Sequence, residues 1–220
     1  MKKPLIIFYV WFVLLLQTST LFADVKDGAV LLQADNFEHI EFSRINSSRY
    51  SFHDQQLKIE VDDSASFLMK SFVQVRQIKQ VSVEWRSEGE PEIKSVQHEE
   101  QREGDDAVFK IGLLLSGEDS FFNPFLPSWM KRVEESLKYP SDNMIYLLVK
   151  AKHASGEQWI NPYNKRISMI AMNVVAGDKD WYTSNYTFET PVNVVAIWLM
   201  ADGDNTDSRF TVKIKSLSLD

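Results

Sequence analysis

The sequence has 220 residues, of which 44% are hydrophobic and 25% charged, so its composition is that of a globular protein rather than of a coiled coil or a disordered chain. It contains no cysteine, which excludes disulfide scaffolds, cysteine-ligated metal sites and cysteine nucleophiles. The formal net charge is −7, a poor match to the phosphates of nucleic acids or to anionic lipids, and no nucleic-acid partner is expected.

The N-terminal segment has the residue order of a secretory signal peptide. Lys2 and Lys3 precede an unbroken apolar run at residues 5–16, and Leu21-Phe22-Ala23 ends the segment. The apolar run is shorter than the roughly 20 residues of a membrane-spanning helix, although an uncleaved membrane anchor is the alternative. We expect cleavage after Ala23, no transmembrane span in the mature chain, and a location in the bacterial periplasm.

Beyond the signal peptide (residues 1–23), the hydrophobic pattern is mainly that of β-strands. Some segments alternate apolar and polar residues, which predicts strands with one exposed face: 57–61, 81–85 and 210–214. Others are apolar on both faces and predict central strands, with buried helices as the alternative: 108–115, 145–149, 167–175 and 194–200. Turn residues separate these segments. Residues 24–220 are therefore expected to form a single all-β domain, an antiparallel two-sheet β-sandwich of the jelly-roll kind.

One segment has helical periodicity. Trp129, Val133 and Leu137 recur every fourth residue, which predicts a short helical insertion over residues 127–139. The preceding Phe-rich segment (residues 121–126) is costly to leave in water. It either seals the end of the sandwich or contacts a partner or a membrane surface. A structural partner-binding protein is therefore one functional alternative.

Acidic residues gather in two turns, one before the strand expected at 108–115 and one before the last strand. They form a candidate acidic cluster: Asp105, Asp106, Asp202, Asp204 and Asn205. Ordinary turn chemistry explains such residues most simply. Calcium prefers several carboxylate oxygens, so a weaker alternative is a calcium site, the only cofactor considered, at Asp202, Asp204 and Asp207. Another alternative is a glycoside hydrolase or lyase that uses paired Asp carboxylates.

Aromatic residues also lie in or beside turns, where exposed rings can stack against sugars: Trp159, Tyr163, Trp181 and Tyr182. Packing of the core or pinning of loops is the alternative role. The sequence lacks G-x-S-x-G, P-loop and G-x-G-x-x-G motifs, which argues against serine hydrolases, nucleotide hydrolases and dinucleotide oxidoreductases. The leading hypothesis is a non-catalytic binding or envelope-associated module, with a carbohydrate or glycan as its first candidate ligand. The sequence does not indicate an oligomeric state.

Five short segments, in their order, resemble one bacterial family: LKIEV at 57–61, VEWR at 83–86, GDDA at 104–107, IYLLV at 145–149 and ADGDNT at 201–206. The order is similar to that of the exported family called domain of unknown function 3047, over nearly all of the mature chain. The resemblance implies an exported β-sandwich without an established activity, whose shared polar residues form one cluster. That family tends to carry an arginine after the double Asp, where this chain has Lys110.

Overall fold

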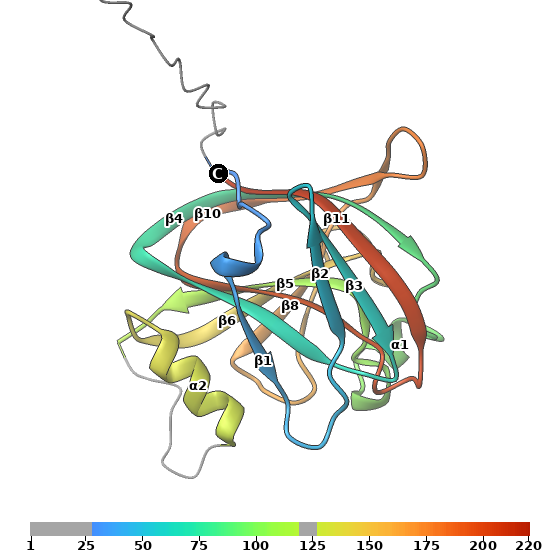
Figure 1. Ribbon diagram of the computed structural model, residues 1–220, viewed down its shortest axis with the longest axis horizontal. Helices are drawn as coiled ribbons and strands as arrows, with labels where there is room; N and C mark the ends of the chain where they lie inside the picture. Colours follow the sequence, from blue (N-terminus) through green and yellow to red (C-terminus); the bar gives the residue numbers. More distant parts are fainter. Residues whose placement is uncertain (1–27, 119–126) are drawn as a thin grey trace, which may run out of the picture.

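The computed structural model describes residues 28–118 and 127–220 (Figure 1). The predicted signal peptide and the Phe-rich segment lie outside these residues. Two α-helices occur in them, α1 (Val96–Glu99) and α2 (Ser128–Ser136), with short 3-10 turns at Ala34–Asn36 and Arg102–Gly104. The strands are β1 (Glu38–Glu41), β2 (Arg49–His53), β3 (Gln56–Asp62), β4 (Ser66–Glu88), β5 (Ala107–Ser116), β6 (Ser141–Val149), β7 (Gln158–Ile160), β8 (Ile167–Ala171), β9 (Val175–Ala176), β10 (Tyr182–Asp202) and β11 (Arg209–Leu219).

The predicted all-β class with one short helical insertion is confirmed. The strands form one hydrogen-bonded sheet in the order β2-β3-β11-β4-β10-β5-β6-β8-β7, with β1 beside β4 and β9 beside β10. Every pairing of the described strands is antiparallel except that of β6 with β8, which is parallel. The parallel pair arises because the chain leaves β6, forms β7 at the sheet edge, and returns through β8 in the direction of β6.

The sheet forms two layers because β4 and β10 are long enough to run through both. They have 23 and 21 residues and pair along most of their length, with register shifts in β10 between Thr187 and Val192 and between Val194 and Ala196. Both strands curve from one side of the molecule to the other (Figure 1). The first layer contains β2, β3, β11 and the late part of β4. The second layer contains β1, the early part of β4, the late part of β10, β5, β6, β8 and β7.

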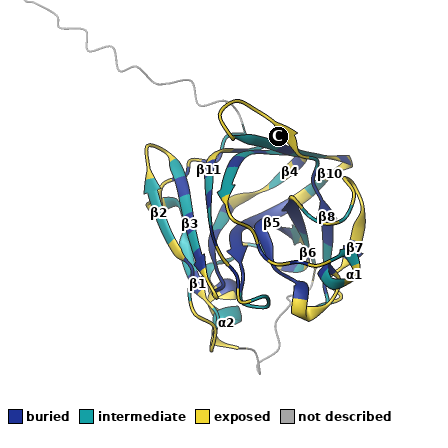
Figure 2. Cartoon of the chain, turned by 90° about the vertical axis from the view of Figure 1, so that its right-hand side faces the viewer, coloured by how far each residue is buried: buried dark blue, intermediate teal, exposed yellow. Residues whose placement is uncertain are grey.

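The main core lies between the layers, and the alternating strands bury one face against it. Leu57, Ile59 and Val61 of β3 are buried while their neighbours are not, as their alternation predicts. Strand β5 differs, because nearly all of its residues are buried (Figure 2). Its outward face belongs to a second apolar cluster that also includes Phe67, Trp198 and Val133. The second layer is therefore covered on its outer face as well.

Helix α2 supplies part of that cover, and it lies within the segment predicted to be helical. Val133 is its buried residue, and the ring of Trp129 meets that of Phe42 edge-on, with centroids 5.1 Å apart. Arg132 ties the helix to β1 through an ion pair with Glu38 at 3.0 Å. The helix thus stands over the outer face of the second layer and forms one wall of a pocket. Neither helix of the described segments has the length and apolar character that crossing a bilayer demands.

Candidate functional site

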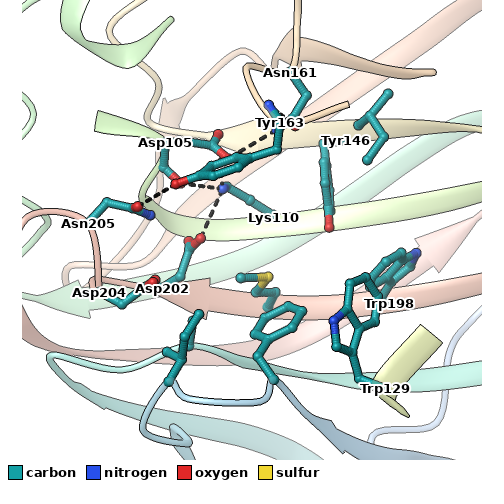
Figure 3. Close-up of a pocket in the computed structure, with 15 residues that line it drawn as sticks. Asp105, Lys110, Trp129, Tyr146, Asn161, Tyr163, Trp198, Asp202, Asp204 and Asn205 are labelled. Carbon is teal, nitrogen blue, oxygen red and sulfur yellow. Dashed lines mark hydrogen bonds and ion pairs between the residues drawn. The ribbon is translucent and has the colours of Figure 1, made fainter. Parts of the chain in front are cut away.

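A pocket of about 270 Å³ lies on the outer face of the second layer. Its floor is formed by β5, β6 and β10, and its walls come from α2, the β1–β2 and β7–β8 loops and the β10–β11 turn. Aromatic and apolar side chains line one end and polar side chains the other (Figure 3). The aromatic end includes Phe42, Trp129, Tyr146 and Trp198, and the polar end Asp105, Lys110, Asn161, Asp202, Asp204 and Asn205.

Lys110 is the centre of the polar end. It is part of a strand that is otherwise apolar, and its side chain is only 2% exposed. Its Nζ lies 2.9 Å from Oδ2 of Asp202 and 3.3 Å from Oδ1 of Asp105, and it donates to the backbone carbonyl of Asp105 at 2.8 Å. A buried ammonium needs opposite charge within contact distance, so these two carboxylates explain why a lysine can occupy this position.

The structure brings together all five residues of the acidic cluster. Asp106 accepts hydrogen bonds from the backbone and side-chain nitrogens of Asn205 and from Oγ1 of Thr206. Asp202 accepts from the backbone N–H of Ala107 at 2.9 Å, which joins the end of β10 to the start of β5. The two turns, almost a hundred residues apart in the sequence, therefore meet because β5 and β10 are neighbouring strands.

The electrostatics of this cluster are dominated by burial. Burial raises the pKa of Asp105 and of Asp204, and raises that of Asp202 well above its usual value, because an ionised carboxylate loses its hydration there. Burial by itself lowers the pKa of the Lys110 ammonium. The carboxylates of Asp105 and Asp202 outweigh this effect, so the pKa is raised. Lys110 is therefore charged, and it shares its charge between two carboxylates.

Three of the acids are close enough to hold a cation. The carboxylate oxygens of Asp106, Asp202 and Asp204 lie within 4.8 Å of one another. Asp207, the third residue of the predicted calcium set, is not in this group and is exposed with a φ of 50°. Because Asp106 and Asp202 already accept hydrogen bonds or an ion pair from the chain, the arrangement fits turn capping, and a calcium site stays a prediction.

Of the four aromatic residues predicted to bind a ligand, Tyr163 alone lines the pocket. Its hydroxyl donates to Oδ1 of Asn205 at 2.7 Å, so the ring lies across the polar end (Figure 3). Trp159 is buried and stacks on His153 with ring centroids 3.8 Å apart. Trp181 lies against the cations of Arg86 and Lys215, and Tyr182 stacks on Trp85. These contacts match the packing and pinning alternative.

Sequence reasoning missed most of the pocket's aromatic end. Trp198 and Tyr146 come from strands that were predicted to be central, and Trp129 from the predicted helix. Gly112 was the available signal, because a glycine inside an apolar strand often marks the close approach of another group. Gly112 pairs with Trp198 on one side and Tyr146 on the other, and a Cβ there would lie 2.7 Å from Cδ1 of Trp198.

The two ends of the pocket offer different chemistry. The rings can stack on flat apolar surfaces, while the carboxylates of the polar end can accept hydrogen bonds and the amide of Asn161 is already engaged with Asp105 at 3.0 Å. Asp105 and Asp202 could serve as an acid and a base only by giving up contacts with Lys110. The pocket is therefore better arranged for binding than for proton transfer.

Comparison with solved structures finds distant similarity to carbohydrate-binding modules. The chain is similar to a low-affinity xylan-binding module of family CBM86 from Roseburia intestinalis, with 11% identity, a TM-score of 0.33, and coverage of 85% of this chain and 90% of that one. It is also similar to a mutant family 29 module made to probe ligand recognition, with 11% identity, a TM-score of 0.31, and coverage of 87% and 86%.

A search of curated proteins found no match. The family comparison is specific: the model described as protein of unknown function (DUF3047) matches residues 35–218. That range contains every segment on which the resemblance was based, and both turns of the acidic cluster. The chain belongs to the DUF3047 family.

Proposed function

We propose that this protein is an exported, non-catalytic carbohydrate-binding module that holds one ring of a glycan in the pocket. One observation carries the proposal: aromatic rings and hydrogen-bonding carboxylates face the same cavity from opposite ends. A sugar ring has apolar C–H faces that stack on aromatic rings and hydroxyls that donate to carboxylates. The volume of about 270 Å³ is near the lower end of ligand pockets, about 300–1,000 Å³, which suits a single ring.

The rings of the aromatic end hold one another in place, which favours binding. Trp198 packs against Phe67 with ring centroids 4.1 Å apart and against Tyr146 at 5.8 Å. Trp129 approaches the same group from α2, 6.3 Å from Trp198. Rings held by their neighbours lose little conformational freedom when a ligand arrives, so more of the contact energy appears as affinity.

Export is the other half of the proposal. It is supported by the charged start, the apolar run and the ending at Ala23, which together match a signal peptide. Cleavage there leaves residues 24–220 as one periplasmic domain. Mass spectrometry of the protein from the periplasmic and cytosolic fractions tests this half, because a periplasmic chain with its N-terminus at residue 24 is expected and a full-length cytosolic chain would contradict it.

Isothermal titration of residues 24–220 with a panel of envelope and plant-wall oligosaccharides tests the binding half. Binding of at least one saccharide is expected. Replacement of Trp129 by Ala should weaken it about two- to tenfold, since an aromatic contact contributes about 0.5–1.5 kcal/mol. The matched control is Trp181→Ala, which removes a partly exposed tryptophan outside the pocket and should leave affinity unchanged. If no saccharide binds, the proposal is wrong.

A glycoside hydrolase or lyase is the second candidate, and one observation favours it. Asp105 and Asp202 converge beside the pocket, and burial raises the pKa of each, as in acid–base sites. Their shared contact with Lys110 argues for the binding role. Release of reducing ends or unsaturated products by the wild-type protein, lost in Asp202→Asn, would establish catalysis instead.

A further inference from the structure

The pocket carries more negative than positive charge at its polar end. Three of its lining residues are carboxylates, Asp105, Asp202 and Asp204, and a carboxylate oxygen of Asp106 lies within 4.8 Å of those of Asp202 and Asp204. Lys110 is the one cation among the described lining residues. Arg102 is close, but its guanidinium lies 5.1 Å from the ring of Tyr163 and it does not line the pocket. Lys110 is already in contact with Asp105 and Asp202, which leaves Asp204 without a counter-charge in the described part of the chain, so the pocket favours a positively charged ligand.

Asp204 is the carboxylate best placed to meet such a ligand. It lines the pocket, is partly buried, and has no hydrogen bond or ion pair with another side chain among the described residues. Asp105 and Asp202 are in contact with Lys110, whereas Asp204 is not. The carboxylate of Asp106 lies nearby and adds repulsion. A cation beside Asp204 would relieve both its lost hydration and this repulsion.

The aromatic end favours the same sign of charge, independently of the acids. The faces of indole and phenol rings carry partial negative charge and attract cations within about 6 Å. One such contact is present in the pocket, because Nζ of Lys110 lies 5.6 Å from the ring centre of Tyr146. Tyr163 crosses the polar end, and Trp129 and Trp198 close the other. A cationic ligand in the pocket therefore meets aromatic faces as well as carboxylates.

We propose that the sugar recognised here is an amino sugar with a free ammonium group, held with that group beside Asp204 and its ring among the aromatic side chains. This inference rests on the proposed carbohydrate-binding function and names the class of sugar. A rigid ring suits a pocket with preordered walls better than a lysine side chain or a polyamine, because flexible chains lose more conformational entropy on binding. Neutral and acidic sugars leave the charge of Asp204 unbalanced.

The test is a calorimetric comparison of two ligands of equal length, a glucosamine oligomer and its fully N-acetylated form. Residues 24–220 should bind the glucosamine oligomer at least about tenfold more tightly, the effect of ~1.4 kcal/mol of charge pairing. Asp204→Asn should remove that preference. Asp54→Asn is the matched control, because Asp54 is an exposed residue of the β2–β3 turn whose φ of 50° asparagine accepts. It makes the same charge change away from the pocket and should keep the preference.

The outcomes separate the inference from the function on which it rests. Equal affinity for the two oligomers, a preference retained in Asp204→Asn, or binding confined to neutral or acidic glycans overturns the amino-sugar inference and leaves carbohydrate binding intact. Absence of binding to every saccharide overturns both. Oligolysine that binds as tightly as the glucosamine oligomer, with the same loss in Asp204→Asn, would replace the amino sugar with a basic peptide.

Discussion

Nζ of Lys110 lies 2.9 Å from Oδ2 of Asp202, and the two side chains are 2% and 3% exposed. The pair joins β5 to β10 and forms the polar end of the pocket, so one contact serves both the fold and the site. Both members of the pair are buried ions that have lost their hydration. Their mutual attraction offsets this loss, so removal of one leaves the other as an uncompensated buried charge. Loss of either side chain should therefore be costly to the fold.

Replacement of Lys110 by Met should therefore destabilise the protein by about 3–5 kcal/mol, because it leaves buried carboxylates without a counter-charge. The free energy of unfolding in urea measures the loss. Lys213→Met is the control, since the ammonium of Lys213 is 3.9 Å from Glu88 and its side chain is 30% exposed. The control should cost less than about 1 kcal/mol. Equal losses in the two variants would show that the buried pair has no special role.

Glu99 gives a second contrast between a buried and an exposed acid. Its carboxylate accepts hydrogen bonds from the backbone N–H groups of Lys152 and His153 and contacts Nδ1 of His153 at 2.8 Å. Glu99→Ala should cost about 1–3 kcal/mol, because it leaves these partly buried donors unpaired. Glu100→Ala removes an exposed partner of the same imidazole and should cost under about 1 kcal/mol. Urea midpoints compare the two, and a larger loss in Glu100→Ala would contradict this assignment.

Stability should also depend on pH through the acidic cluster. The pKa values of Asp105, Asp202 and Asp204 are raised by burial, so the folded chain holds protons that the unfolded chain has released. Between the ordinary carboxyl pKa of about 4 and the raised values, the free energy of unfolding should fall as pH rises. Asp202→Asn should make that fall shallower, and Asp54→Asn should not. Urea unfolding at a series of pH values measures the slopes, and equal slopes in the three proteins would refute the assignment.

The strands could be predicted where side chains alternate, as at Leu57, Ile59 and Val61. The helix could be predicted from Trp129 and Val133. The length of β4 could not, because polar residues interrupt its middle, where the strand bends between layers and both faces are exposed. Convergence of the acidic turns was implied by the family resemblance. The role of Lys110 as their counter-ion was missed, although a single lysine inside an apolar strand requires an acidic partner in the fold.

Gly112→Ala should affect the pocket without changing any charge. A Cβ at this position would lie 2.7 Å from Cδ1 of Trp198 and 2.2 Å from Cε of Met144, so the indole must move. We expect a loss of about 1–3 kcal/mol in stability from this overpacking. Saccharide affinity should fall about tenfold as the stacking surface shifts. Calorimetry on the folded variant measures the affinity, and an unchanged value would mean that Trp198 does not contact the sugar.

The most direct test of carbohydrate binding in this pocket follows the indole N–H resonances of ¹⁵N-labelled residues 24–220 during titration with the bound saccharide. The tryptophans report on different places: Trp129 and Trp198 line the pocket, whereas Trp159 and Trp181 lie elsewhere. We predict that the resonances of Trp129 and Trp198 shift with saturation while those of Trp159 and Trp181 stay in place. Shifts confined to Trp159 or Trp181, with Trp129 and Trp198 unmoved, would contradict it.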